Sequence, residues 1–270
     1  MQGREAYRGP LQAIIFDWAG TTVDYGCRGP VAVFQRAFNS FGLYPSQEQI
    51  RRPMGMEKRQ HCAEMLAMPE LAEQWQAKYG KLPGKDETDA VFAKVWELMP
   101  GTLADYAEPV PHCLEVMEHL RERGMKIGSC TGYSRPMMTE LLPRARKAGY
   151  NPDCLVCADE VPAGRPMPWM CWLNCMRLSV FPPDAVVKVG DTIADIKEGL
   201  NAGHWTVGVV RSSNALGLSE AEADSLELAE LRAKEAEIES MFRQAGAHYV
   251  ISDLAELPHV CDLIEQGLES

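Results

Sequence analysis

Three apolar segments of this sequence end in polar residues that could act together chemically. Asp17 ends LQAIIFD, Thr131 follows KIGSC, and Asp191 ends VVKVGD with Asp195 one helical turn later. The carboxyl ends of parallel strands meet at one rim of a sheet, so these residues would lie close together. Carboxylates that meet there repel one another unless a hard cation such as magnesium lies between them. The sequence therefore predicts a magnesium site, although each residue alone could be a strand end, a turn residue or a helix cap.

A second candidate for chemistry is a lysine in the segment 53–61, PMGMEKRQH. Lys58 is followed three residues later by His61, which a helix would place on the same face, and two methionines precede it. In a partly apolar, sulfur-rich pocket the ammonium form of a lysine is disfavoured, and the neutral amine can attack an aldehyde to form a Schiff base. Taken alone, both residues are more typical of an ordinary solvated helix.

The hydrophobic pattern predicts the elements that would position these residues. Residues 11–17 form a short apolar run typical of a buried strand. From about residue 30 to 100, apolar residues recur at spacings of three and four, which predicts a helical unit inserted after the first strand. From residue 109 onward helical and strand patterns alternate, and this predicts an α/β fold with a parallel sheet covered by helices on both faces. The charged segment 219–244 favours a solvated helix.

Composition and charge narrow the class of protein. With 270 residues, 46% of them hydrophobic, the chain can bury the core of one large domain or of a domain with a smaller insert. The net charge of −11 disfavours nucleic acid and anionic membranes, because proteins bind both through clustered Lys and Arg. No stretch approaches the roughly 18–20 apolar residues of a membrane span, and the first apolar run lacks the features of a signal peptide. We therefore expect a cytoplasmic protein that binds neither nucleic acid nor a membrane.

The nine cysteines leave one alternative open. Cys154 and Cys157 form a CxxC, and Cys171 and Cys175 follow at helical spacing, so a four-thiolate zinc site is conceivable. The simpler interpretation places the first pair on a strand, where a separation of three sends the two side chains to opposite faces. The second pair then lies on a helix that packs against this strand.

The order of the motifs resembles that of the haloacid dehalogenase superfamily. The matching segments are DWAGT at Asp17–Thr21, the Thr131 strand end, Arg165, and GDTIAD at Gly190–Asp195. This resemblance implies a Rossmann-like core formed by residues 1–24 and 106–270, with residues 25–105 as a mobile, all-helical cap. It also implies Asp17 as the nucleophile and Thr131 as a donor to the phosphoryl oxygens. The implied magnesium ligands are Asp17, Asp191 and the backbone carbonyl of Ala19, supported by Asp195.

One departure from the superfamily pattern is informative. Most of its phosphatases have a second Asp two positions after the nucleophile, which protonates the alkoxide leaving group, whereas this chain has Ala19. A methyl group cannot act as an acid. The leaving group must therefore be stabilised by another residue, and Lys58 is the candidate.

A narrower resemblance is to the phosphonoacetaldehyde hydrolase (phosphonatase) family. The segments that carry it are FDWAGTTVDYGC, RRPMGMEKRQH, TGYSR, VPAGRPMPWM and KVGDTIADIKEG. The resemblance implies that Lys58 forms an imine with phosphonoacetaldehyde, that Asp17 takes the phosphoryl group, and that acetaldehyde and phosphate leave. It gives Arg165 the role of balancing Asp17 and contacting the phosphoryl group. It further implies a pocket lined by His61, Cys27, Met54, Gly55 and Tyr133, and a homodimer formed through the cap.

Three other functions share part of this pattern. A phosphate-ester phosphatase of the same superfamily would need an acid where Ala19 stands. A dehalogenase that attacks carbon has no need of magnesium, and the Asp191 and Asp195 pair disfavours it. A non-catalytic binding protein on the same fold would not require Asp17, Arg165 and Asp191 together.

Overall fold

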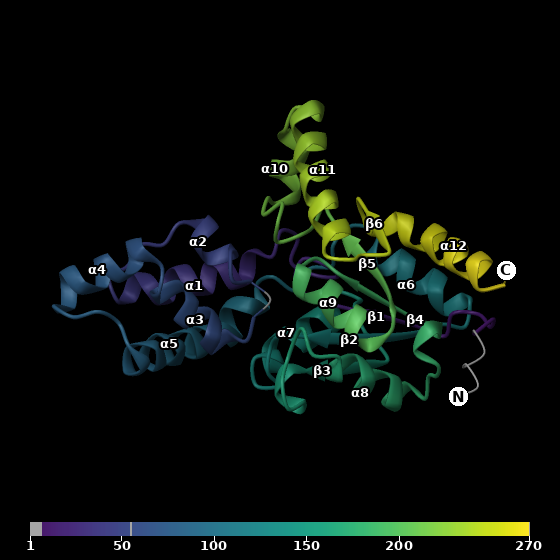
Figure 1. Cartoon of the computed structure of the whole chain (residues 1–270), viewed down its shortest axis with the longest axis horizontal. Helices are drawn as coiled ribbons and strands as arrows, with labels where there is room; N and C mark the ends of the chain where they lie inside the picture. The colour runs from purple at the N-terminus through teal and green to yellow at the C-terminus, as the bar shows by residue number, and fades with distance from the viewer. Residues whose placement is uncertain (1–6, 55, 270) are drawn as a thin grey trace.

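The computed structural model describes residues 7–54 and 56–269, and a parallel sheet forms the centre of the molecule (Figure 1). The sheet has six strands in the order β3-β2-β1-β4-β5-β6. Their bounds are β1 Ala13–Phe16, β2 Lys126–Thr131, β3 Cys154–Cys157, β4 Val186–Gly190, β5 Trp205–Val209 and β6 Tyr249–Ile251. Every pair of neighbours is parallel, so the predicted parallel α/β fold is confirmed. Phe16 is in register with Ser129 on one side and Val189 on the other, which aligns the three strand ends of interest.

Helices cover both faces of the sheet because its strands are apolar on both sides. The covering helices are α6 Cys113–Glu122, α7 Met138–Lys147, α8 Trp169–Leu178, α9 Ile193–Ala202 and α12 Leu257–Glu269. On β1, Ile14 and Phe16 belong to the apolar cluster that includes residues of α6 and α12, whereas Ala13 and Ile15 pack with α8. All four side chains are buried.

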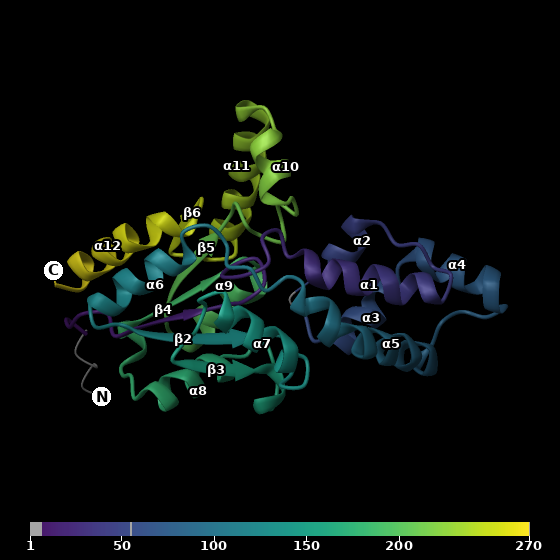
Figure 2. The ribbon, with the colours of Figure 1, turned by 180° about the vertical axis from the view of Figure 1, so that it is seen from behind.

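A separate group of helices lies beyond the carboxyl ends of the strands (Figures 1 and 2). It consists of α1 Arg28–Ser40, α2 Gln47–Arg51, α3 Lys58–Leu66, α4 Pro69–Tyr79 and α5 Lys85–Ala104. The buried residues of α1 include Val33, Phe34, Ala37 and Phe38, whose spacing forms one apolar face, and α1 packs on α5. This layout fits the division into a core and a cap at residues 25–105, and those boundaries remain a prediction.

The segment 219–244 forms two helices where one was predicted. Helix α10 spans Glu220–Ser225 and helix α11 spans Leu228–Gln244, and the two project away from the sheet (Figure 1). The Ser225 hydroxyl donates to the Glu222 carbonyl at 2.8 Å, a local bond that competes with continuation of the helix. Leu226 then adopts an extended conformation.

The cysteines follow the simpler interpretation. Cys154 and Cys157 both lie on β3, and their side chains belong to apolar clusters on opposite faces of the sheet. Cys171 and Cys175 lie on α8, which packs on β3. All nine cysteines are free thiols.

In the described part of the chain, every helix is too short or too polar to span a membrane.

Candidate active site

Asp17 directly follows β1 at the rim of the sheet, in the turn that leads to the cap. Its backbone N–H donates to the Val189 carbonyl at 3.0 Å, which fixes the turn against β4. Gly20 has a φ of +86°, and a Cβ there would lie 2.3 Å from Asp191 Oδ2. Only glycine fits this position, because the backbone of residue 20 is in the left-handed region and lies directly against the Asp191 carboxylate. The turn thus brings Asp17 and Asp191 to the same site, as predicted from the strand ends.

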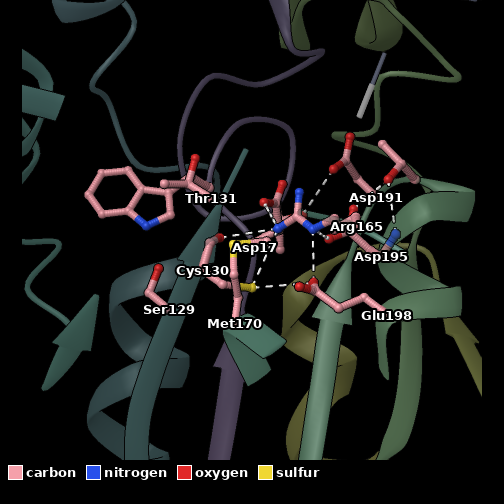
Figure 3. Close-up of polar contacts among 12 residues, drawn as sticks. Asp17, Ser129, Cys130, Thr131, Arg165, Met170, Asp191, Asp195 and Glu198 are labelled. Carbon is pink, nitrogen blue, oxygen red and sulfur yellow. Dashed lines mark hydrogen bonds and ion pairs between the residues drawn. The ribbon is translucent and has the colours of Figure 1, made fainter. Parts of the chain in front are cut away.

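The guanidinium group of Arg165 lies between buried carboxylates (Figure 3). Its Nη2 donates to Asp17 Oδ1 at 2.5 Å and its Nε to Glu198 Oε2 at 2.8 Å, with Asp195 Oδ1 3.0 Å from the same Nε. The side chain is 4% exposed. Nη1 has no hydrogen-bond partner among the residues that the structure describes. One donor of the fork therefore remains available for a substrate oxygen.

Lys188, the central residue of β4, adds a second buried cation. Its Nζ donates to Asp195 Oδ1 at 2.7 Å and lies 3.6 Å from Glu198 Oε2. Burial alone would raise the pKa of Asp195, but Arg165 and Lys188 hold it below its ordinary value. Asp195 Oδ2 also accepts from the Thr192 hydroxyl. Asp195 is thus occupied by protein donors and is better suited to support the site than to bind a metal directly.

The carboxylates around Arg165 outnumber the cations, a charge balance that favours binding of a divalent metal ion. Asp17, Asp195 and Glu198 pair with the cations Arg165 and Lys188, and Asp191 lies beside Asp17 and Asp195. When all four carboxyl groups are ionised, the cluster therefore carries two more negative charges than positive ones. Burial, opposed by Arg165, raises the pKa of Asp17, and burial with the neighbouring Asp17 raises the pKa of Asp191 well above its ordinary value. Oxygens of Asp17, Asp191 and Asp195 lie within 4.8 Å of one another. A divalent ion bound to Asp17 and Asp191 would remove this repulsion, since hard oxygen ligands are those that magnesium prefers.

Lys58 comes from the cap and lines the same cavity as Asp17. It is the first residue of α3, and the Glu57 side chain caps that helix. Its side chain is buried, with Nζ 5.4 Å from the centre of the Tyr133 ring. Among the described residues no hydrogen bond or ion pair holds this nitrogen. Burial lowers the pKa of Lys58, although Cys27 and Asp17 oppose the shift. Burial thus shifts Lys58 towards the neutral amine that imine chemistry requires.

The cavity has an empty volume of about 370 Å³, part of it open to solvent. It is lined by Asp17, Ala19, Cys27, Pro30, Met54, Lys58, Thr131, Gly132, Tyr133, Arg165, Asp191 and Thr192. Thr131 Oγ1 accepts from the Tyr133 N–H at 3.1 Å, which leaves the Thr131 hydroxyl hydrogen free to be donated. The structure therefore gathers the predicted residues Cys27, Met54, Thr131 and Tyr133 around Asp17 and Lys58.

One residue expected in this pocket, His61, is not among its lining. His61 is fully buried within the cap, where its Nε2 lies 2.8 Å from the Ile50 carbonyl and its ring stacks on Phe34 at 3.9 Å. Burial lowers the pKa of His61 well below its ordinary value, and the nearby positive charge of Lys58 lowers it further. Gly55 lies outside the described residues. A helical spacing of three correctly places His61 near Lys58, but packing of its ring on Phe34 directs it into the cap.

Lys188 and Glu198 were not identified from the sequence. Lys188 had a signal, because a lysine in the middle of the apolar segment VVKVG requires a buried counter-charge. Glu198 lies on α9 one turn after Asp195 and had no comparable signal. Its Oε1 atom is buried and has no hydrogen-bond partner among the residues that the structure describes, while its Oε2 accepts from Arg165.

Comparison with known proteins places the chain among hydrolases. The family model of haloacid dehalogenase-like hydrolases matches residues 11–203. A phosphonoacetaldehyde hydrolase of Nitratidesulfovibrio vulgaris is 49% identical over 97% of this chain and 94% of its own length. A bifunctional phosphonoacetaldehyde hydrolase/aminoethylphosphonate transaminase of Clostridioides difficile is 45% identical over 97% of this chain and 41% of its own length. The crystal structure of a phosphonoacetaldehyde hydrolase-like protein from Oleispira antarctica has a TM-score of 0.96 at 34% identity, covering 100% of this chain and 98% of that one.

Proposed function

The chain belongs to the haloacid dehalogenase-like hydrolases, and we propose that it hydrolyses the carbon–phosphorus bond of phosphonoacetaldehyde to give acetaldehyde and phosphate. The observation that carries this proposal is that Lys58 and Asp17 line one cavity. One of them suits attack on an aldehyde carbon and the other suits attack on phosphorus. Relatives that carry this name, at 46–49% identity over nearly the whole chain, support the choice of substrate.

The first step in this proposal is imine formation at Lys58. The neutral amine attacks the aldehyde carbon, and loss of water gives the imine, which is protonated on nitrogen. Burial favours this step because it lowers the pKa of Lys58. The Tyr133 ring beside Nζ provides an apolar wall with a weakly negative face, which tolerates both the amine and the iminium cation.

The second step is attack of Asp17 on phosphorus. A bond forms between a carboxylate oxygen and phosphorus, the carbon–phosphorus bond breaks, and its electron pair moves into the iminium group to give an enamine. Arg165 positions the nucleophile through Nη2, and its free Nη1 is available to the phosphoryl oxygens. The Thr131 hydroxyl is a second donor at the same rim. Ala19 is compatible with this route, because the enamine needs no acid at that position.

The last steps return the enzyme to its starting state. Water attacks the phosphorus of the aspartyl-phosphate, which frees phosphate and regenerates the Asp17 carboxylate. Protonation of the enamine carbon and hydrolysis of the imine release acetaldehyde and regenerate the Lys58 amine. One water molecule is consumed overall, because the water lost in imine formation is returned in imine hydrolysis.

Magnesium is part of the proposal. Asp17, Asp191 and the Ala19 carbonyl would hold the ion, and the two unbalanced negative charges of the site support this assignment. When bound, magnesium would supply charge stabilisation for the transferring phosphoryl group. Asp195 pairs with Lys188 and Arg165 and would hold these two cations in place beside the metal site.

The proposal is tested by phosphate release from phosphonoacetaldehyde, measured beside a panel of alkyl phosphates and sugar phosphates. We expect turnover of the phosphonate and, because position 19 lacks an acid, ester turnover slower by about a hundredfold or more. Equal rates on the esters would favour a phosphatase and reject the assigned reaction.

A cytoplasmic location and a homodimer are further proposals that rest on the family resemblance. Large exposed apolar side chains lie on the cap, including Tyr79 and Trp96, and also on α8 of the core, including Trp172 and Met176. The cap proposal predicts that Trp96→Ser dissociates the dimer and that Trp172→Ser does not, as measured by light scattering after gel filtration. The opposite result would place the interface on α8.

A further inference from the structure

Arg51, the last residue of α2, attaches the cap to the core through its guanidinium group. Nη1 donates to the Gly26 carbonyl at 2.7 Å and to Asn214 Oδ1 at 3.1 Å, and Nη2 donates to the Gly217 carbonyl at 2.9 Å. In return, Asn214 Nδ2 donates to the Arg51 carbonyl at 3.4 Å. Arg51 and Asn214 thus exchange hydrogen bonds across the boundary between the two groups of helices. No carboxylate pairs with Arg51 among the described residues, so oxygen dipoles alone bind it.

The core segment that receives Arg51 is the loop 212–218, which follows β5 and also contacts the catalytic turn. The Asn214 backbone N–H donates to Asp191 Oδ2 at 2.8 Å, and the Ser212 hydroxyl donates to the Gly20 carbonyl at 2.6 Å. The Ser212 carbonyl accepts from the Gly26 N–H at 2.8 Å. One short loop therefore touches the cap, the segment that enters the cap, the turn after Asp17 and the proposed metal ligand Asp191.

The fit around this loop leaves no room for side chains. Gly26 has a φ of +77°, and a Cβ there would lie 2.1 Å from the Leu218 carbonyl oxygen. Gly217 has a φ of +68°, and a Cβ there would lie 2.8 Å from Arg51 Nε. Asp24 and Cys27 also have positive φ angles, of 58° and 51°. With the cap in this position Arg51 reaches its acceptors on the loop 212–218, and a small displacement of α2 would separate it from them.

We propose that Arg51 and Asn214 form a latch that holds the cap over the cavity and, through the Asn214 backbone, fixes the Asp191 carboxylate. Closure of the cap and assembly of the active site are then one event. This inference rests on the proposed function, because closing is useful only if Lys58 of the cap must meet Asp17 of the core. Arg51 and Asn214 are positioning residues and do not touch the reacting atoms.

The neighbouring Arg52 provides a matched control. Arg51 and Arg52 both line a groove with an empty volume of about 1220 Å³ between α2 and the loop 212–218, next to the catalytic cavity. Arg52 is exposed, and its guanidinium group makes no hydrogen bond or ion pair with the described residues. A different explanation for two arginines in this acidic protein is electrostatic attraction of the anionic substrate, to which both would contribute.

The test compares Arg51→Ala, Arg52→Ala, Asn214→Ala and the double variant Arg51→Ala/Asn214→Ala. Hydrogen exchange without substrate should become faster at residues 24–27 and 212–218 in Arg51→Ala and stay unchanged in Arg52→Ala. We expect kcat on phosphonoacetaldehyde to fall about tenfold or more in Arg51→Ala, with little change in Arg52→Ala. The double variant should lose scarcely more than the worse single variant, because both substitutions break the same contact.

Two results would overturn the latch. Equal losses of kcat/KM in Arg51→Ala and Arg52→Ala that shrink at high salt would show attraction of the substrate instead. Unchanged exchange at residues 24–27 and 212–218 in Arg51→Ala would show that these contacts do not control closure. Because exchange is measured without substrate, the latch can stand even if the wild type fails to cleave phosphonoacetaldehyde, so the two failures are distinguishable.

Discussion

The Nζ atom of Lys58 lies 5.4 Å from the centre of the Tyr133 ring and 6.0 Å from that of Phe34, and no carboxylate pairs with it in the described part of the chain. An uncompensated lysine at a buried position costs free energy, since its charge is removed from water. Proteins retain such residues where the neutral amine is needed.

Replacing Lys58 by methionine should therefore stabilise the fold. The pKa of Lys58 is lowered in the folded state, so the unfolded chain binds more protons between this lowered value and the ordinary one, and the unfolding free energy of the wild type rises with pH through that window. Lys58→Met should lack this rise and should melt about 2–4 °C higher near neutral pH for each kcal/mol gained. Calorimetric melting curves recorded across pH measure both the pH dependence of stability and the difference in melting temperature. If Lys58→Met melts below the wild type at neutral pH, burial of Lys58 does not cost the free energy that we assign to it.

Magnesium should stabilise the wild type and have no such effect on Asp191→Asn. Without metal, Asp191→Asn should be the more stable protein, because burial and Asp17 raise the pKa of Asp191 and its charge is unfavourable there. A concentration of one hundred times the dissociation constant should add about 2.7 kcal/mol to the wild type. Melting temperatures with and without magnesium give the comparison, and Glu118→Gln, at an exposed position of α6, is the control. An equal magnesium effect in Asp191→Asn would remove Asp191 from the metal site.

Arg165→Lys should lower kcat/KM by about a hundredfold although it keeps the charge. Arg165 contacts Glu198 and Asp17 through two different nitrogen atoms, Nε and Nη2, and keeps Nη1 for the substrate. All three donors of an ammonium are on one nitrogen atom, which cannot occupy these separate positions. The affinity for inorganic phosphate, measured by titration calorimetry, should fall in parallel. Arg177→Lys, which alters an exposed ion pair with Glu160, should leave both quantities unchanged. Wild-type phosphate affinity in Arg165→Lys would show that the fork geometry is not needed.

Ala19→Asp should increase hydrolysis of alkyl phosphate esters relative to that of the phosphonate. The new carboxyl group would enter the cavity beside Asp17 and could protonate an alkoxide, while its added charge increases repulsion in a site that already carries excess negative charge. The ratio of the two rates is the measurement, and Ala19→Asn is the control because it has a similar shape and cannot supply the proton. An equal change in both variants would show an effect of size only.

The sequence predicted the core part of the site well because parallel strands impose the geometry. Once β1, β2 and β4 are neighbours in register, Asp17, Thr131 and Asp191 must lie at one rim. The charge network behind them was less accessible, since Glu198 reaches Arg165 only through the packing of α9 on the sheet. The position of Lys58 near Asp17 was predicted only from the family resemblance, because no local sequence pattern determines how a cap packs on a core.

The contacts that seat the cap had no signal in the sequence. Arg51 and Asn214 are far apart in the chain, and their pairing depends on two turns that only glycine permits, at Gly26 and Gly217. The break between α10 and α11 was also missed, because charge spacing along 219–244 is compatible with one helix or two.

Reductive trapping at Lys58 tests the central claim most directly. The protein is incubated with phosphonoacetaldehyde, treated with borohydride, and digested for peptide mapping by mass spectrometry. The account predicts a reduced adduct of the aldehyde portion on Lys58 alone, and neither an adduct at this position nor carbon–phosphorus cleavage in Lys58→Arg, which should keep its fold and its magnesium-dependent stabilisation. An adduct on another lysine, or full turnover of phosphonoacetaldehyde by Lys58→Arg, would contradict the imine mechanism.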